Sequence, residues 1–431
     1  MKALLLTASL AASLAGAPVF AASGQLIWDD VYDPMTGDAS ASQVAVAGGF
    51  AYVAGGGPYK VTPSSDADIR VRAYDVASGA LRWEDVWDAG GIHQDDEVSG
   101  LAVGGTRLFL AGSSGTNTAG SNGYVVRAYD RRDGTVLWED HCGQFGSRAR
   151  AIVADGGSVF AAGTCSPGTG GAGLLRAYAA STGAQRWEVD DVALPLALAV
   201  SGGTVLVAGA DDGGHLVLRA YTTRQGRFLW EARPAEAQGL SLRTAELVVG
   251  DGKVYLAWWA VDSNSQDTNQ VAAYGLRKGR LRWQADPGDR VNRLALDSNR
   301  LFTAEAGSQV LVSAYAASDG ALLWQDQPGT PSAPYTALAV TVGDKRVFVA
   351  GQAFDPAVES APHFMVRAYT RTGRLLWEDA TPTDTMLGAQ AQGLGWTRGV
   401  LVAAGIDSNS VPPFGFTHWL VRAYATEDRG R

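Results

Sequence analysis

The sequence contains only two cysteines, Cys142 and Cys165, which stand 23 positions apart. It has no adjacent cysteine pair and no Cys-x-x-Cys-His motif, so a covalently attached c-type haem is excluded. After the N-terminus, no apolar run approaches the roughly 20 residues that a membrane helix needs. The formal net charge is −9, which argues against nucleic acid or an anionic membrane as the main partner. No helical periodicity is evident, and short apolar runs between Gly-rich turns indicate strands.

The N-terminal segment has the composition of an export signal. Residues Met1 to Ala21 contain one cation, Lys2, then an apolar stretch and a small-residue cleavage site at Val19-Phe20-Ala21. We therefore expect a periplasmic or secreted protein whose residues 22–431 form one domain. This part of the chain has 410 residues, or about 51 for each of eight repeats, which suits a four-stranded propeller blade.

One short phrase occurs eight times along the chain. Its full form runs from Ala73 to Trp83, as Ala-Tyr-Asp-Val-Ala-Ser-Gly-Ala-Leu-Arg-Trp. The Tyr returns at Tyr129, Tyr178, Tyr221, Tyr274, Tyr315, Tyr369 and Tyr424, and the Trp at Trp138, Trp187, Trp230, Trp283, Trp324 and Trp377. A repeat of this length cannot bury its faces alone and must stack on neighbours.

The eighth Trp is missing after Tyr424 and is found at the other end of the chain, as Trp28. This split predicts an all-β fold, an eight-bladed β-propeller closed by pairing of its N- and C-terminal strands. We expect residues Gly24 to Asp30 to be the outer strand of the last blade, paired with residues Trp419 to Tyr424.

A second covariation supports the ring. Six repeats have Arg two residues before the Tyr, and the same six have an acid directly after the Trp. The pairs are Arg72 with Glu84, Arg127 with Glu139, Arg176 with Glu188, Arg219 with Glu231, Arg367 with Glu378 and, across the junction of the two ends, Arg422 with Asp29. The other two repeats have Ala272 and Ser313 with Gln284 and Gln325. A charge that is lost together with its opposite predicts a cross-strand ion pair; anion binding by the arginines is the alternative.

The pattern from Ala73 to Trp83, nearly complete again at Ala128 to Trp138 and Ala177 to Trp187, resembles the tryptophan-docking motif of PQQ-like (quinoprotein-type) β-propellers. The resemblance covers essentially all of residues 22–431 and implies an eight-bladed ring in which each Trp packs on the neighbouring blade. The same ring serves pyrroloquinoline quinone dehydrogenases and non-enzymatic subunits of the outer-membrane assembly machinery, so it leaves function open.

The dehydrogenases of that family use a vicinal disulfide, a calcium or lanthanide ion and insertions that cover the quinone. This chain has no vicinal cysteines and is shorter. We therefore predict the non-catalytic branch of the family, with no cofactor and no metal site; PQQ with Ca is the alternative.

Most inner-strand positions carry small residues at alternate places, as crowding around an axis requires. Three larger polar residues interrupt this set, and we expect Gln43, Glu246 and Arg293 to line the central channel. Glu246 and Arg293 fall on adjacent blades, so an ion pair within the channel and a ligand contact are both open interpretations.

The connections between strands 2 and 3 of each repeat and between blades are long and varied, and in a propeller they open on one face. Function is often carried by such loops. Candidate binding residues there are Trp87, His93, Asp95, Asp96, Trp258, Trp259, Phe414 and Phe416. Each aromatic residue could instead cap its own blade, and the stretch from His93 to Glu97 is either a solvated acidic loop or a cation site.

Because an export signal implies an oxidising compartment, we predict a disulfide between Cys142 and Cys165, which fall in loops expected on one face of the third repeat. The chain as a whole is interpreted as a monomeric propeller scaffold that binds a protein partner through its long-loop face without catalysis. A quinoprotein-like dehydrogenase and a carbohydrate-binding propeller are the alternatives.

Overall fold

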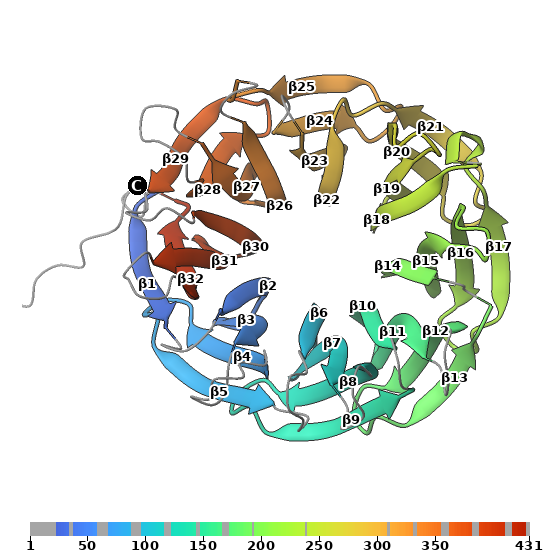
Figure 1. Cartoon of the computed structure of the whole chain (residues 1–431), viewed down its shortest axis with the longest axis horizontal. Coiled ribbons are helices and arrows are strands. Elements are labelled where there is room, and N and C mark those ends of the chain that lie inside the picture. The colour runs from blue at the N-terminus through green and yellow to red at the C-terminus, as the bar shows by residue number, and fades with distance from the viewer. Residues whose placement is uncertain are drawn as a thin grey trace, which may run out of the picture.

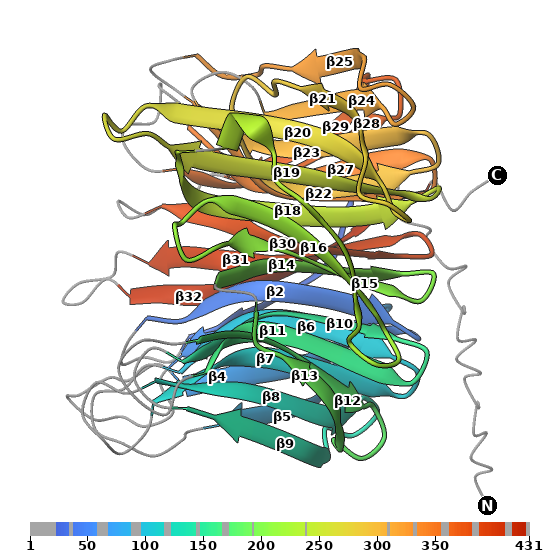
Figure 2. The ribbon, with the colours of Figure 1, turned by 90° about the vertical axis from the view of Figure 1, so that its right-hand side faces the viewer.

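A computed structural model describes residues 23–33, 38–57, 68–87, 96–115, 122–143, 147–165, 172–191, 194–237, 239–307, 311–330, 334–354, 362–381, 388–409 and 416–427. Their strands form eight separate four-stranded antiparallel sheets arranged as blades around a central axis (Figure 1). Figure 2 shows the same blades edge-on, stacked side by side around the ring. The predicted eight-bladed β-propeller is thereby confirmed.

Blades 1 to 4 follow one another along the chain, and each begins at the axis and ends at the rim. Blade 1 comprises β2 (Ser40–Ala47), β3 (Phe50–Gly57), β4 (Asp68–Asp75) and β5 (Leu81–Trp87). Blade 2 comprises β6 (Glu97–Gly104), β7 (Arg107–Gly115), β8 (Asn122–Asp130) and β9 (Val136–Cys142). Blade 3 comprises β10 (Arg148–Asp155), β11 (Ser158–Cys165), β12 (Ala172–Ala179) and β13 (Gln185–Val189). Blade 4 comprises β14 (Leu194–Ser201), β15 (Thr204–Ala210), β16 (Leu216–Thr222) and β17 (Phe228–Ala232).

Blades 5 to 7 repeat this order after a short 3-10 turn, η1 (Ala235–Ala237), and blade 8 completes the ring. Blade 5 comprises β18 (Ser241–Gly250), β19 (Lys253–Val261), β20 (Asp267–Gly275) and β21 (Leu281–Ala285). Blade 6 comprises β22 (Arg290–Asp297), β23 (Arg300–Ala306), β24 (Val312–Ala316) and β25 (Leu322–Asp326). Blade 7 comprises β26 (Tyr335–Gly343), β27 (Arg346–Ala353), β28 (His363–Thr370) and β29 (Leu375–Thr381). Blade 8 comprises β30 (Ala389–Thr397), β31 (Val400–Asn409), β32 (Phe416–Ala425) and β1 (Leu26–Tyr32).

The two ends of the chain close the ring within blade 8, as predicted. Strand β1 pairs with β32 in antiparallel register, from Leu26 opposite Tyr424 to Tyr32 opposite Trp419. The strand begins two residues later than expected, because Gly24 has a positive φ of 84° and turns the chain instead of extending it. It also ends two residues later, since the pairing continues to Tyr32.

Seven docking Trp residues lie against the turn between the third and fourth strands of the next blade, and Trp377 lies against Gly24 where the two ends of the chain meet in blade 8. Trp28 of blade 8 donates from Nε1 to the carbonyl of Val76 in blade 1 at 2.8 Å and stacks on Tyr74 with the ring centroids 5.7 Å apart. Its indole occupies the space beside Gly79, where a Cβ would stand 2.7 Å from the ring. Gly79 also has a φ of 72°, so the turn requires glycine for both conformation and space.

The core is divided among the junctions between blades. The described residues form eight clusters of buried apolar side chains, each built from two neighbouring sheets; Val53 and Val76 of blade 1, for example, pack with Val402 and Trp419 of blade 8. No described helix is long and apolar enough to cross a lipid bilayer.

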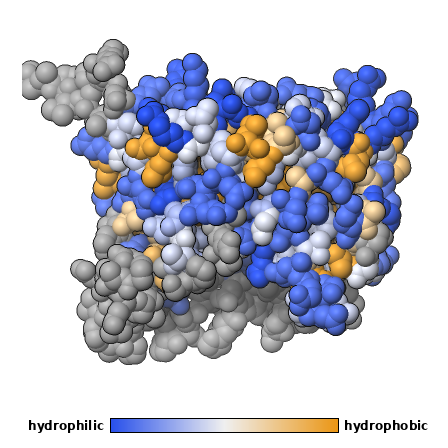
Figure 3. Space-filling model, turned by 90° about the horizontal axis from the view of Figure 1, so that it is seen from above, coloured by the Kyte–Doolittle hydropathy of each residue, from blue (hydrophilic) through white to orange (hydrophobic). Residues whose placement is uncertain are grey.

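Large apolar side chains that stay exposed lie on the outer strands. On the side of the rim seen in Figure 3 they form separate orange patches within a hydrophilic surface. Scattered apolar side chains of this kind are ordinary on a soluble surface, so this view of the rim gives no reason to expect a partner there.

Candidate functional site: the long-connection face and the axial channel

The antiparallel order of the strands gives the ring two different faces. We call the side where the first and third strands of every blade begin the long-connection face, because it receives the links between strands 2 and 3 and between blades. On the opposite side, the short-turn face, the described residues form the tight turns within hairpins, such as Gly48-Gly49 and Gly104-Gly105, and the junction of the two chain ends at Gly24 and Thr426. The sequence-predicted binding residues that the structure describes, Trp87, Asp96, Trp258, Trp259 and Phe416, belong to the parts of strands and connections nearest the long-connection face.

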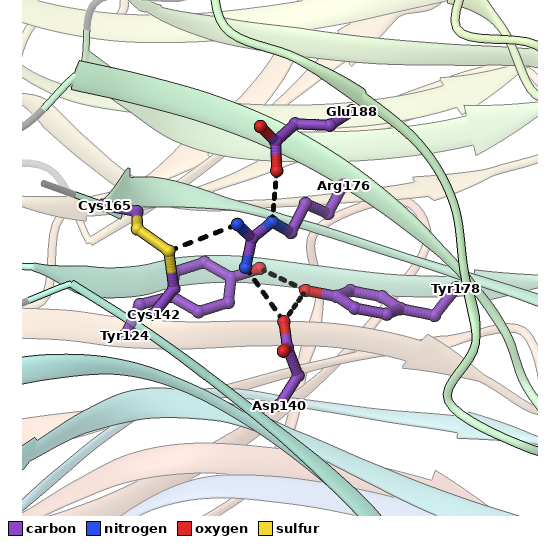
Figure 4. Close-up of a disulfide and its surroundings, with 7 residues drawn as sticks. All are labelled: Tyr124, Asp140, Cys142, Cys165, Arg176, Tyr178 and Glu188. Atoms are coloured by element: carbon purple, nitrogen blue, oxygen red, sulfur yellow. Dashed lines mark hydrogen bonds and ion pairs between the residues drawn. A yellow bond between two sulfur atoms is a disulfide. The ribbon is translucent and has the colours of Figure 1, made fainter. Parts of the chain in front are cut away.

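Near this face, an arginine of one blade is bound by a carboxylate of the preceding blade. Arg176 of blade 3 donates from Nε to Glu188 of its own blade and from Nη1 to Asp140 of blade 2 at 2.9 Å (Figure 4). The hydroxyl of Tyr178 donates to the same Asp140 oxygen at 2.7 Å. Burial is the largest cause of a strong rise in the pKa of Tyr178, and the nearby Tyr124 and Asp140 raise it further. This phenol therefore remains a hydrogen-bond donor.

The same bridge occurs at six of the eight junctions. The interacting sets are Arg72 and Tyr74 with Asp30, Arg127 and Tyr129 with Asp85, Arg176 and Tyr178 with Asp140, Arg219 and Tyr221 with Asp191, Arg367 and Tyr369 with Asp326, and Arg422 and Tyr424 with Asp379. The cross-strand pairs expected within blades are confirmed for five of these arginines, and Arg422 lies opposite Asp29 in the register.

Sequence analysis missed the inter-blade carboxylate. In five of the six junctions it is the second residue after the docking Trp, as in Asp85 after Trp83. The two blades without the Arg, blades 5 and 6, follow blades with Ala232 and Ala285 at that position. This covariation was present in the sequence, but finding it requires knowing that consecutive blades meet through these strands.

A covalent link adjoins the bridge between blades 2 and 3. Cys142, the last residue of β9, and Cys165, the last residue of β11, form a disulfide whose Cα atoms are 5.7 Å apart. Arg176 also points Nη2 at Cys142 Sγ over 3.2 Å (Figure 4). Both cysteines end strands instead of lying within loops, so the link fixes strand ends at the long-connection face.

The predicted aromatic binding residues have different environments. Trp87 is half-buried between Arg127, whose Cζ is 4.9 Å from the ring centroid, and His141, whose ring is 5.6 Å away. Trp258 is 1% exposed and packs in the core between blades 4 and 5, so it offers no surface to a partner. Trp259 is half-buried under the guanidinium of Arg290, 4.4 Å from its ring centroid.

The structure describes two of the five remaining candidates. Asp96 is buried just before β6. Phe416 begins β32, where its backbone pairs with Asn409. His93, Asp95 and Phe414 lie outside the described residues.

Gln43, Glu246 and Arg293 all line one cavity of about 380 Å³ around the axis, together with Arg150 and Arg243. Arg293 Nη1 lies 3.8 Å from Glu246 Oε2, at the outer limit of an ion pair. Burial raises the pKa of Glu246, and the positive charge of Arg293 partly opposes this shift. Three arginines and one carboxylate line this cavity, so its described lining is predominantly basic.

Blades 5 and 6 are also exceptional in their second strands. In six blades the sixth residue of the second strand is glycine. At Gly112, for example, an added Cβ would lie 2.2 Å from the carbonyl oxygen of Glu97. Blade 5 has Trp258 there, and its β-bulge lies two residues further along, between Leu242 and Thr244. Blade 6 has Glu305, which is fully buried and accepts a hydrogen bond from Thr303 at 2.5 Å. Burial raises the pKa of Glu305 to about 8.

Potential metal ligands are not clustered among the described residues. The described residues contain no group of three or more His, Cys, Asp or Glu side chains able to hold a metal ion. Three histidines at or near the start of third strands belong to blades 4, 7 and 8 and do not converge: His215, His363 and His418.

Comparison with known proteins identifies a family whose sequence model matches most of this chain. A family model described as outer membrane protein assembly factor BamB matches residues 121–258 and 247–404. No curated protein sequence matches the chain.

Several solved structures share the fold at low sequence identity. BamB from Moraxella catarrhalis is 15% identical with a TM-score of 0.56, over 93% of this chain and 99% of that one. Quinohemoprotein alcohol dehydrogenase from Comamonas testosteroni is 12% identical with a TM-score of 0.57, over 95% and 77%. The C-terminal WD40 domain of Sif2 is 10% identical with a TM-score of 0.59, over 93% and 99%. These structural likenesses establish the propeller fold and leave function open.

Proposed function

We propose a function from one premise: this chain belongs to the family of the outer membrane protein assembly factor BamB. The proposed function is that of an exported scaffold that binds a protein partner through its long-connection face. The family name further suggests a partner within an outer-membrane protein assembly.

The observation that carries this proposal is the reinforcement of strand ends near one face. Six Arg–Asp–Tyr bridges and the Cys142–Cys165 disulfide join neighbouring blades there. The arginine side chains are 8–14% exposed, so water screens these ion pairs less than ordinary surface pairs. A face whose connections start from fixed strand ends is preorganised, which reduces the entropy lost when a partner binds.

A site-specific photo-crosslinking experiment tests the proposal. A photoreactive residue is placed in the exported protein at Asp212 or Asn264, which are exposed on the long-connection face. Matched positions on the short-turn face are Ser78 and Asp319, also exposed. We expect a discrete protein adduct from the first pair and none from the second. Adducts from the short-turn positions alone, or from neither pair, would overturn the proposal.

The quinone-dependent neighbours raise the question of whether PQQ and Ca²⁺ would fit this chain. The two cysteines join different blades and cannot form a vicinal pair. The axial cavity has one described carboxylate, Glu246, beside three arginines, which is a poor donor set for a hard cation. The described residues therefore do not fit a quinone–calcium site. Addition of PQQ with Ca²⁺ to the purified protein, followed by a redox-dye assay with alcohols and aldose sugars, should give no substrate-dependent dye reduction.

A further inference from the structure

The turn between the third and fourth strands of blade 5 differs in charge from its equivalent in blade 1. Blade 1 reads Tyr-Asp-Val-Ala-Ser-Gly-Ala-Leu-Arg-Trp from Tyr74, whereas blade 5 reads Tyr-Gly-Leu-Arg-Lys-Gly-Arg-Leu-Arg-Trp from Tyr274. Blade 5 has thus lost the carboxylate of Asp75 and has gained cations at Arg277, Lys278 and Arg280. The turn itself is retained, since Trp230 of blade 4 donates to the carbonyl of Leu276 at 2.9 Å.

The arginine before the docking Trp has a polar partner in two other blades. In blade 1, Arg82 forms an ion pair with Asp75 at 2.6 Å. In blade 3, Arg186 donates to the hydroxyl of Ser158 at 2.6 Å.

Neither partner is available to Arg282 in blade 5. The place of Asp75 is taken by Gly275, and that of Ser158 by Lys253, another cation. The Arg282 guanidinium lies over Gly275, where an added Cβ would be 3.1 Å from Nη2. Arg282 has no ion pair with any described residue.

These residues enclose an open cleft of about 460 Å³ on the short-turn face. Its charged lining consists of Arg277, Lys278, Arg280 and Arg282, and no described carboxylate lines it; Asp251, in the adjoining turn, is outside it. The chain as a whole carries a net charge of −9, so a cleft with four unneutralised cations is a local reversal of sign.

A backbone donor is also left open in this turn. In blades 1 and 2 the Asp after the Tyr accepts a hydrogen bond from the amide two residues on, as Asp75 does from Ala77 at 3.1 Å and Asp130 from Arg132 at 2.9 Å. The corresponding amide of blade 5, that of Arg277, has no acceptor among the described residues. An incoming anion could therefore replace both the charge and the acceptor oxygen that Asp75 supplies in blade 1.

We propose that this cleft of blade 5 is a binding site for a phosphate-type anion, held by the guanidinium groups of Arg280 and Arg282, the ammonium of Lys278 and the amide of Arg277. Guanidinium groups bind tetrahedral oxyanions through paired hydrogen bonds, and an amide at a turn adds a fixed donor. The phosphate can belong to a soluble phosphate compound or to a lipid headgroup.

The decisive variant is Gly275→Asp, which returns the carboxylate of blade 1 to blade 5. Gly275 has an ordinary backbone conformation, and the neighbour of its new side chain is the mobile end of Arg282, so the variant should fold. An internal carboxylate a few ångströms from the anion should weaken binding about tenfold or more. Arg82→Ala, which removes an exposed arginine from the same face of blade 1, is the matched control and should leave binding unchanged.

Calorimetric titration at low salt with inorganic phosphate and with glycerol phosphate measures the soluble form of the ligand. Co-sedimentation with phosphatidylglycerol vesicles, against phosphatidylcholine vesicles, measures the lipid form. The expected result is saturable binding in either experiment that is weakened by added salt and weakened about tenfold or more by Gly275→Asp, with an unchanged thermal melting temperature. Absence of binding in both experiments, or binding that Gly275→Asp does not change, would overturn the proposal.

Discussion

Tyr129 in blade 2 donates its phenolic hydrogen to Asp85 in blade 1 over 3.0 Å, although the two residues lie in different sheets and 44 positions apart in the chain. Arg127 reaches the same carboxylate oxygen at 2.9 Å. Tyr129 is fully buried, so no solvent water can accept the hydrogen bond of its hydroxyl if Asp85 is removed. The bridge thus couples the stability of one blade to the next.

Replacement of Asp85 by Ala should lower the free energy of unfolding by about 1–3 kcal/mol, because a buried hydroxyl and a mostly buried guanidinium lose their shared acceptor. Thermal and denaturant unfolding of the whole chain measure this loss. Asp212→Ala changes an exposed aspartate without a described partner and should shift stability by less than about 0.5 kcal/mol. Equal effects of the two substitutions would contradict the structural role of the bridge.

Deletion of residues 24–32 should leave β32 with an unpaired edge and open the ring. It also removes Trp28, which binds the carbonyl of Val76, and Asp30, which binds Arg72 and Tyr74. An exposed strand edge promotes association between chains. We expect a strongly lowered melting temperature and aggregates in size-exclusion chromatography with light scattering. A monodisperse deletion variant with an unchanged melting curve would show that closure does not depend on β1.

The Cys142–Cys165 disulfide should stabilise the junction of blades 2 and 3. Constraint of the unfolded chain by this cross-link is worth about 3 kcal/mol. Intact mass after alkylation without reductant should reveal no free thiol in protein produced in an oxidising compartment, and the Cys142→Ser/Cys165→Ser variant should melt at a lower temperature. Two alkylated thiols, or equal stability of the variant, would contradict this prediction.

Glu305 should make stability depend on pH. Burial raises its pKa in the folded protein to about 8, from an ordinary value of 4.5. Its contribution is fully present below the ordinary pKa and is lost as the pH rises through 8, because the unfolded chain releases the proton first. Glu305→Gln, which is neutral at every pH, should remove this decline and gain on the order of 5 kcal/mol relative to the parent above pH 8.

Denaturant titrations between pH 5 and pH 9 measure the slope for both proteins. Glu427→Gln, at an exposed position, serves as the control and should retain the slope of the parent. If the slopes of the parent and the Glu305→Gln variant coincide, Glu305 does not carry the buried proton.

Much of the ring could be predicted from local sequence. The Tyr–Gly–Trp phrase is continuous in seven repeats, and the split of the eighth copy between Tyr424 and Trp28 indicates eight blades and their closure before any coordinates are known. The arginine–glutamate pairs were also predictable, because both partners lie within one repeat, as in Arg127 and Glu139.

The candidate site was less predictable, since its features depend on which strands meet. Trp258 looks like an exposed loop aromatic in the sequence, but the register of β19 places it in the core between two blades. Asp85 is one acid among many until the structure brings it to Arg127 and Tyr129. Likewise, Arg282 becomes unusual only when the fold shows that Gly275 and Lys253 stand where other blades have a partner for it.

The number of blades, the strand order and the point of closure thus follow from the sequence, because they depend on a repeated local pattern of turns and large side chains. The pairing of charges, the burial of aromatic residues and the position of the unneutralised cations depend on the folded ring. These properties arise between blades, where residues about 40 positions apart come within hydrogen-bonding distance, and no local pattern specifies such contacts.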